Sequence, residues 1–312
     1  MKRAERRARA MGSAVQVVVW AAAHADRLAE LGMLRIDLLE SCWTRFRPES
    51  ELSRLNARAG SGPLPASADL LTLVQTMVDA YEWTDGAVDA SVLDAMCAAG
   101  YDVDFAEVRR RASASDWPDG STVLAARPAH GMAGLEVDHQ AGTVLLPAGR
   151  RLDPGAVGKG LAGEIVAEEL RSAGAAAVLV SIGGDVVAHG TPPTGAWRVS
   201  VQDDRRSVPT SLEVIELGSP RCAVATSSVL RRRWIHGHHL LDPRTGSPSH
   251  SDVVQATVVA SLGWQAEAAA TFAVLRGSAT AVRWLGDRSL DAFLLPLDPD
   301  RPSWLVGWPT VA

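Results

Sequence analysis

Two periods of apolar residues run through the chain, and they predict a mixture of helices and strands. In one segment Leu70, Val74 and Met77 recur at helical spacing, and Ser67 can cap the helix that they define. The same spacing predicts helices at 24–40, 69–83, 160–173 and 264–275. Short apolar runs bounded by turn residues predict strands at 15–20, 135–138, 143–146, 177–182, 186–189, 197–202 and 253–260.

The order of these elements favours an α+β fold. Strands joined by hairpins outnumber strand–helix–strand crossovers, for example around the turns at 139–142 and 183–184. We therefore predict one α+β domain at 11–312, with largely antiparallel sheets and flanking helices. The basic residues 1–10 are expected to form an extension outside it. The polar, Pro- and Gly-rich stretch 102–133 is expected to be a surface excursion.

Composition narrows the class of protein. The 312 residues are 47% hydrophobic with a mean hydropathy of +0.04, which is enough apolar material for a sizeable core. A net charge of −5 and the absence of a basic, aromatic stripe argue against a nucleic-acid partner. The cysteines, Cys42, Cys97 and Cys222, have no zinc-ligand or disulfide-framework spacing. No apolar run is long enough to predict a transmembrane helix.

The N-terminus imitates a secretory signal, with basic residues at 1–9 followed by a mostly apolar run at 14–23. Against that interpretation, Gln16 interrupts the apolar run and Glu5 lies within the basic part. We therefore expect a cytoplasmic protein. Export remains the alternative if this segment acts as a signal.

A histidine before a sharp turn is the leading candidate for proton transfer. His239 precedes Leu240-Leu241 and then the turn formers Asp242-Pro243. The ordinary imidazole pKa, near 6.5, suits proton transfer at neutral pH. The neighbouring His238 and His236 are expected to be exposed.

Two further segments carry groups suited to phosphate and metal. In 152–160 a strand enters a Gly-rich turn with Lys159 at a helix start, where backbone N–H groups favour phosphate, although the spacing is not that of a Walker loop. The alternative is a flexible turn with a solvated lysine. Glu267 and Thr271 are one helical turn apart and share a face, so both oxygens are available to a hard cation. Their alternative is a surface glutamate and a threonine packed by its methyl group.

Six segments in register resemble the ApbE family, the FAD:protein FMN transferases. They are SELSRLN at 50–56, GAVDASV at 86–92, LDPGAVGKGLAGE at 152–164, SIGGD at 181–185, the histidine turn after Thr226-Ser227, and AEAAAT at 266–271. The similarity extends from about residue 11 to about residue 277. It implies a single ApbE-like, T-fold-like domain, in agreement with the α+β prediction.

The resemblance also assigns roles to individual residues. It implies that FAD contacts Met11, Asp89, Lys159, Glu164, Gly183, Gly184, Asp185, Thr226, Ser227, Asp242 and Thr245, and that Mg²⁺ binds the Ala156 carbonyl, Glu267 and Thr271. Within that set Glu164 is expected near the adenosine end, Met11 against the flavin ring, and His239 is the functional histidine. Several positions depart from the family pattern. Glu267 stands where Asp is usual, Ser228 where Gly is usual, Ser181-Ile182 where Asn is often found, and Ala90-Ser91 where Pro-Thr is usual.

The function implied by the resemblance is Mg²⁺-dependent transfer of FMN from FAD to a Ser or Thr hydroxyl of an acceptor protein, with release of AMP. Water in place of that hydroxyl would give FAD hydrolysis to FMN and AMP at the same site. A flavin-binding protein without catalysis is the third possibility, since the departures fall at motif positions. FAD and an acceptor protein are therefore the expected partners.

Overall fold

A computed structural model describes residues 1–113, 126–208, 210–217, 220–234 and 237–308. Its centre is an eight-stranded sheet in which every neighbouring pair is antiparallel. In spatial order the strands are β1 (Lys2–Ala10), β2 (Ser13–Ala21), β6 (Ala177–Ile182), β7 (Asp185–His189), β10 (Arg221–Ser228), β15 (Val253–Ala260), β16 (Asp291–Pro296) and β17 (Trp304–Val306).

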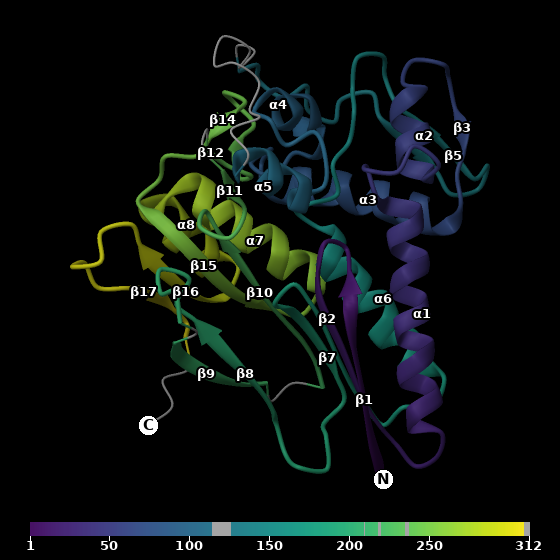
Figure 1. The fold of residues 1–312 in the computed structure, drawn as a ribbon, viewed down its shortest axis with the longest axis vertical. Helices are drawn as coiled ribbons and strands as arrows, with labels where there is room; N and C mark the ends of the chain where they lie inside the picture. Colours follow the sequence, from purple (N-terminus) through teal and green to yellow (C-terminus); the bar gives the residue numbers. More distant parts are fainter. Residues whose placement is uncertain (114–125, 209, 218–219, 235–236, 309–312) are drawn as a thin grey trace.

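Helices cover one face of this sheet, and a two-stranded ribbon covers part of the other (Figure 1). The helices are α1 (Ala25–Trp43), α6 (Gly158–Ser172), α7 (Gly263–Arg276) and α8 (Ser278–Asp287), and the ribbon is β8 (Trp197–Gln202) with β9 (Ser211–Leu217). Helix α7 is buried from Ala266 to Leu275, because the sheet, α6 and α8 all pack against it. Its run of alanines lets these elements approach closely.

The remaining elements gather beyond one end of the sheet (Figure 1). They are α2 (Glu51–Ala57), α3 (Ala68–Trp83), a 3₁₀ turn (Ala90–Val92), α4 (Leu93–Ala98), α5 (Phe105–Ser113), β3 (Leu64–Pro65), β4 (Glu136–Asp138), β5 (Thr143–Leu145), and the short pairs β11 (Arg233–Trp234) with β12 (Gly237–His238) and β13 (Leu241–Asp242) with β14 (Ser247–Pro248). Ser67 caps α3 as predicted, since its side chain accepts a 3.2 Å hydrogen bond from Leu70 N.

All the predicted helices and strands are present, with ends shifted by no more than a few residues. The N-terminal segment differs from expectation. Residues 2–10, expected to form an extension outside the domain, are strand β1 and pair with β2 over nine positions. The arginine-rich sequence of β1 gives little indication of a strand, because Ala4 and Ala10 are its buried residues and most of the others are polar. Hydrogen bonds to β2 hold the strand in place.

The stretch expected to be a surface excursion also has a more specific arrangement. Residues 114–125 lie outside the described residues, but Tyr101 and Phe105 pack with Trp234 in a small cluster next to the main core. No described helix is long and apolar enough to cross a membrane.

Candidate active site

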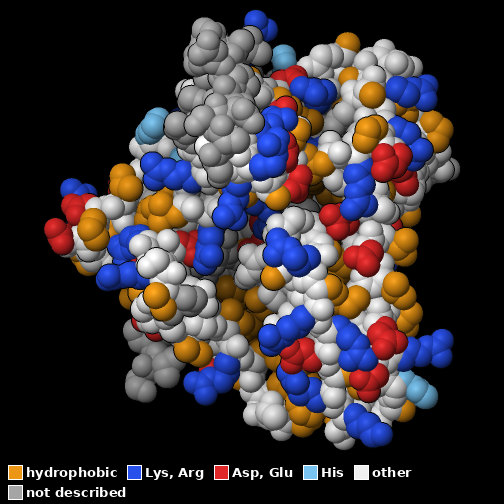
Figure 2. All heavy atoms as spheres, in the orientation of Figure 1, with side chains coloured by type: hydrophobic (Ala, Val, Ile, Leu, Met, Phe, Trp, Pro, Cys, Tyr) orange, Lys and Arg blue, Asp and Glu red, His pale blue; other side chains and the backbone are white. Residues whose placement is uncertain are grey.

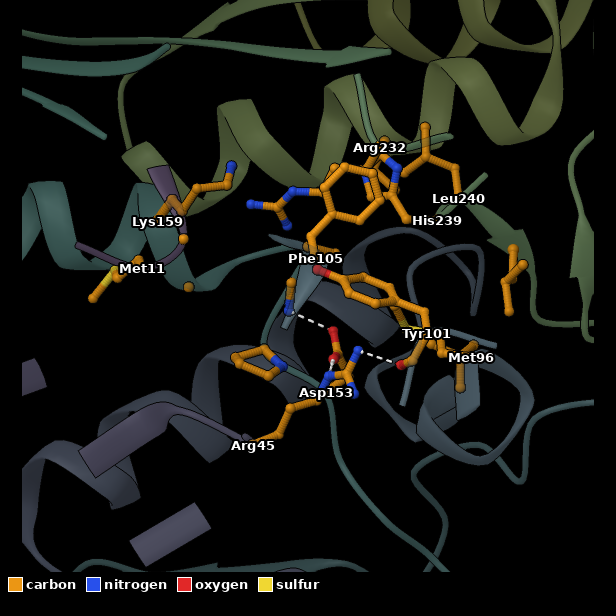
Figure 3. Close-up of a pocket in the computed structure, with 18 of the residues that line it drawn as sticks. Met11, Arg45, Met96, Tyr101, Phe105, Asp153, Lys159, Arg232, His239 and Leu240 are labelled. Atoms are coloured by element: carbon orange, nitrogen blue, oxygen red, sulfur yellow. Dashed lines mark hydrogen bonds and ion pairs between the residues drawn. The ribbon is translucent and has the colours of Figure 1, made fainter. Parts of the chain in front are cut away.

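A cavity lies between the helix-covered face of the sheet and the smaller elements beyond its end (Figure 3). Segments far apart in the sequence form its wall. These are the β1–β2 turn, the end of α1, the segment from Ala87 to Phe105, the start of α6, the chain around His239 and one face of α7. Of the residues singled out from sequence, Met11, Asp89, Ala156, Lys159, His239 and Thr271 line it.

The start of α6 is pressed against the start of α7 by two glycines. A Cβ added to Gly160 would lie 2.2 Å from the Gly263 carbonyl oxygen, and one added to Gly263 would lie 2.1 Å from the Gly160 carbonyl oxygen. Any side chain at either position would therefore separate the two helices. The contact places Lys159, the predicted phosphate ligand, beside the predicted metal-binding face of α7.

Lys159 lies between two carboxylates. Its ammonium donates to Glu267 Oε1 at 2.6 Å and also pairs with Asp185, while the other oxygen of Glu267 accepts from Gly160 N at 2.8 Å. Burial raises the pKa of Glu267. Burial alone would lower the pKa of Lys159, but the carboxylates of Asp185 and Glu267 outweigh it and raise that pKa. With all three groups ionised, the cluster carries one excess negative charge.

Hydroxyl groups extend this network toward the sheet. Thr271 Oγ1, one turn along α7 from Glu267, lies 2.9 Å from Ser227 Oγ on β10. The backbone N–H of Thr226 donates to Asp185 Oδ1 at 3.0 Å, so β10 fixes the carboxylate that faces Lys159. The hydroxyl of Thr226 points elsewhere and pairs with Thr257 at 2.8 Å.

The predicted metal ligands fit a hard cation. Glu267 and Thr271 place a carboxylate and a hydroxyl one turn apart on α7, and Ala156 lines the same cavity as Thr271. The excess negative charge of the cluster favours a cation there. One carboxylate oxygen of Glu267 accepts a hydrogen bond from Gly160 N, which fixes the position of this side chain. Across the described part of the chain, no group of three or more His, Cys, Asp and Glu residues is placed to hold a metal.

His239 is half-buried in the cavity wall with an unpartnered nitrogen. Its backbone N–H donates to the Arg232 carbonyl at 3.1 Å, while Nδ1 has no hydrogen-bond partner among the described residues. Burial and then the charge of Arg232 lower the pKa of His239 to about 3. The imidazole is therefore neutral at neutral pH. His238, expected to be exposed, is half-buried with Nε2 3.0 Å from the Ser249 carbonyl, and His236 lies outside the described residues.

Met11 reaches the cavity from a strained turn. It is the first residue of the two-residue turn between β1 and β2, and both Met11 and Gly12 have positive φ, 51° and 66°. That is the geometry of a type I′ hairpin turn, which a methionine rarely occupies. The buried carboxylate of Asp89 accepts a 2.8 Å hydrogen bond from Ser91 N and so caps the short turn that forms part of the wall.

Sequence reasoning missed an aromatic wall. Phe46 and Tyr101 flank the guanidinium of Arg45, which lies 4.2 and 4.6 Å from their ring centroids. Arg45 also pairs with Asp153 at 2.5 Å, and Asp153 Oδ1 in turn accepts from Gly155 N (Figure 3). The SELSRLN motif at 50–56, which follows Phe46 in the sequence, was the signal that could have drawn attention to this segment.

Several predicted flavin contacts lie away from the cavity wall. Glu164 pairs with Arg221 and accepts from Gly263 N at 2.9 Å, which caps α7. Asp242 pairs with Arg244 at 2.6 Å, and the exposed Thr245 completes the same turn by accepting from Ser247 N.

One departure from the family pattern and one turn lie behind the cavity wall. Gly183 and Gly184, both with positive φ, form the hairpin turn between β6 and β7, and a Cβ on Gly183 would lie 3.4 Å from the Lys159 side chain. This turn therefore supports Lys159 and delivers Asp185 to it. The hydroxyl of Ser228, where the family usually has Gly, accepts from Leu230 N instead of entering the cavity.

Comparison with protein-family models gives a match to the ApbE family over residues 11–294. This chain belongs to the ApbE family. The FAD:protein FMN transferase of Vibrio cholerae is 29% identical over 240 residues, which cover 74% of this chain and 68% of that protein. A transferase of the same name from Klebsiella pneumoniae is 25% identical over 305 residues, covering 91% and 84%.

Solved ApbE structures share the fold. The flavin transferase ApbE of Vibrio cholerae superposes with a TM-score of 0.78 over 98% of this chain and 97% of that one, at 22% identity. The ApbE protein of Thermotoga maritima gives a TM-score of 0.79 over the same shares, at 21% identity. The predictions of the ApbE family, of its α+β fold and of an enzyme of the transferase class are confirmed.

Proposed function

We propose that this ApbE-family enzyme transfers FMN from FAD to a Ser or Thr hydroxyl of an acceptor protein, releases AMP and requires Mg²⁺. Flavin transfer from FAD to a protein is the activity in the names of its curated relatives. The observation that supports it here is the meeting of Lys159, Thr271 and the neutral His239 on one cavity. A phosphate-binding cation, a cation-binding helix face and a proton acceptor are the groups that phosphoryl transfer needs.

Magnesium would be held by Glu267, Thr271 and the carbonyl of Ala156. When bound, it neutralises charge on the pyrophosphate and so favours departure of AMP. Lys159 and the first turn of α6 would hold the phosphates, because backbone N–H groups at a helix start favour anions. The lysine is kept charged and in place by Asp185, which is itself fixed by Thr226 N.

His239 would receive the proton of the acceptor hydroxyl. As the hydroxyl oxygen forms a bond to the phosphorus of the FMN half, the bond between that phosphorus and the bridging oxygen breaks, and AMP leaves with the electron pair. Burial and the charge of Arg232 lower the pKa of His239, so the imidazole is unprotonated before the reaction. The negative pyrophosphate of bound FAD would raise that pKa toward the range that suits a general base. The wall of Phe46, Tyr101 and Phe105 offers flat apolar surface to the flavin ring and excludes water.

The test is nucleotide analysis after incubation of the purified protein with FAD and with either Mg²⁺ or EDTA. Each condition is run with and without an acceptor protein that one of the curated relatives modifies. We expect AMP release and a fluorescent flavin band on a denaturing gel in the arm with Mg²⁺ and acceptor, and neither product in EDTA. AMP with free FMN in every Mg²⁺ arm would identify a hydrolase instead. FAD left intact in all arms would reject both reactions. The cytoplasmic location stays a prediction.

A further inference from the structure

One cation that lines the cavity has no carboxylate partner among the described residues. The described basic side chains that line the cavity are Arg45, Lys159 and Arg232. The first two are each held by carboxylates, as described above. Arg232 makes no ion pair with a described acidic residue, and its Nη2 reaches Ser13 Oγ at a long 3.4 Å. An arginine held this loosely at the wall of a cavity is available to an anionic ligand.

The position of Arg232 places it between the groups that carry the chemistry. Its carbonyl accepts from the backbone N–H of His239, and its side chain extends into the cavity toward Lys159 (Figure 3). A Cβ on Gly12 would lie 3.8 Å from Arg232 Nη2, so the β1–β2 turn lies directly beside the guanidinium. The glycine at this position keeps the space beside the guanidinium open.

One carboxylate lies on the same side of the cavity and is otherwise engaged. Asp104 lines the wall near Gly12, but its Oδ1 accepts a 2.8 Å hydrogen bond from Ala106 N at the start of α5. Asp104 and Arg232 do not approach within the distance of an ion pair among the described contacts. Arg232 is therefore not neutralised by the residue best placed to do so.

Charge balance favours a further cation for an anionic ligand. Lys159 is paired with two carboxylates that offset its charge, so a phosphate held by Lys159 and the start of α6 would gain from a second contact with Arg232. The pyrophosphate of FAD carries two negative charges. An arginine presents several N–H donors in a planar fork that fits phosphate oxygens, and it does so at any physiological pH.

We propose that Arg232 binds the pyrophosphate of FAD and holds the transferred phosphoryl group beside His239. This inference rests on the proposed function. The guanidinium donates to phosphate oxygens in the bound substrate and in the transition state, when charge grows on those oxygens.

The experiment compares the affinities of FAD and riboflavin in the wild type, Arg232→Gln, Arg232→Lys and Arg233→Gln, by titration of flavin fluorescence with Mg²⁺ present. Riboflavin has the same ring system and no phosphate. Arg233 is the adjacent, exposed arginine of β11 and serves as the matched control. We expect Arg232→Gln to weaken FAD binding about tenfold to a hundredfold, Arg232→Lys to lie between it and the wild type, and riboflavin binding to be unchanged in all four proteins.

Unchanged FAD affinity in Arg232→Gln would overturn the assignment, and so would an equal loss of riboflavin affinity, which indicates a general collapse of the cavity. These failures are distinct from failure of the proposed function. A wild type that binds and transfers flavin, with Arg232→Gln equal to it, removes only the role of Arg232. A wild type that does not bind FAD removes both.

Discussion

The ammonium of Lys159 and the carboxylate of Glu267 are 108 residues apart in the sequence and 2.6 Å apart in the fold. The predicted phosphate ligand and the predicted metal ligand are thus direct partners. Because Asp185 also binds Lys159, the pair carries excess negative charge until a cation joins it. Loading of the site with metal is therefore expected to control how Lys159 meets a phosphate.

Replacing the carboxylate of Glu267 should weaken metal binding while the protein stays folded. In Glu267→Gln the excess negative charge is gone, so we expect a fall in transfer rate of about a hundredfold or more and a large rise in the Mg²⁺ concentration needed. Asp185 still holds Lys159, so the protein should remain folded. A Mg²⁺ titration of the transfer rate checks this, with the exposed Asp37→Asn on α1 as control. An unchanged Mg²⁺ requirement in Glu267→Gln would contradict the metal assignment.

Removal of the imidazole should affect chemistry more than binding. In His239→Gln we expect the transfer rate to fall by about 10²–10⁴-fold, the usual contribution of a general base, while the affinity for FAD changes little. Single-turnover kinetics and flavin titration separate the two effects. The exposed His139→Gln, in the turn between β4 and β5, is the matched control. A loss of FAD affinity as large as the loss of rate would show that His239 binds substrate instead.

The lowered pKa of His239 has a consequence for stability. Its folded-state pKa, about 3, lies below the ordinary value of 6.5, so between these pH values the unfolded chain binds a proton that the folded chain does not. The free energy of unfolding should therefore decrease as the pH falls from 6.5 toward 3. Denaturant titrations at several pH values should show a smaller decrease in His239→Gln than in the wild type. Equal slopes in the two proteins would mean that His239 titrates normally in the fold.

The crossing of α6 and α7 should tolerate no added methyl group. In Gly160→Ala the new Cβ meets the Gly263 carbonyl, so the helices must separate, and we expect a loss of about 1–3 kcal/mol in unfolding free energy. Separation also pulls Glu267 from Gly160 N and weakens Mg²⁺ binding. Gly286→Ala, in the exposed end of α8 with open space around it, should instead stabilise by up to about 1 kcal/mol. Thermal unfolding distinguishes the two, and a Gly160→Ala protein as stable as the wild type would refute the close contact.

Met11 is expected to lower the stability of the fold and to contribute to FAD binding. In Met11→Gly the positive φ is relieved, so we expect the unfolding free energy to be kept or raised by about 1 kcal/mol, while FAD binding weakens severalfold as the cavity loses part of its wall. Asp85→Gly, at the similar φ of 50° after α3, should have the first effect without the second. Parallel measurements of thermal unfolding and FAD titration check both. Full FAD affinity in Met11→Gly would show that the strained turn serves the fold alone.

The local patterns determined much of this protein. The spacing of Leu70, Val74 and Met77 fixed α3, and the cap at Ser67 fixed its start, because helix periodicity and capping depend on neighbours in the sequence. The order of the motifs was sufficient to identify the family and to select His239, Lys159 and Thr271 as site residues. The fold places all three around one cavity. The arginine-rich strand β1 was not predicted, because its own residues lack the apolar pattern of a strand and its pairing with β2 holds it in the sheet.

Tertiary structure decided what these groups are able to do. Sequence could not show that Lys159 is held between Asp185 and Glu267, nor that Arg232 has no such partner in the described part of the chain. Each statement depends on strands and helices that meet only in the fold. The fold also shows that Glu164, predicted to contact FAD, accepts a hydrogen bond from Gly263 N at the start of α7. A motif names the residue type at a position. The charge, burial and hydrogen-bond partners that set its chemistry come from distant segments. At the α6–α7 crossing, two glycines allow two of these segments to meet.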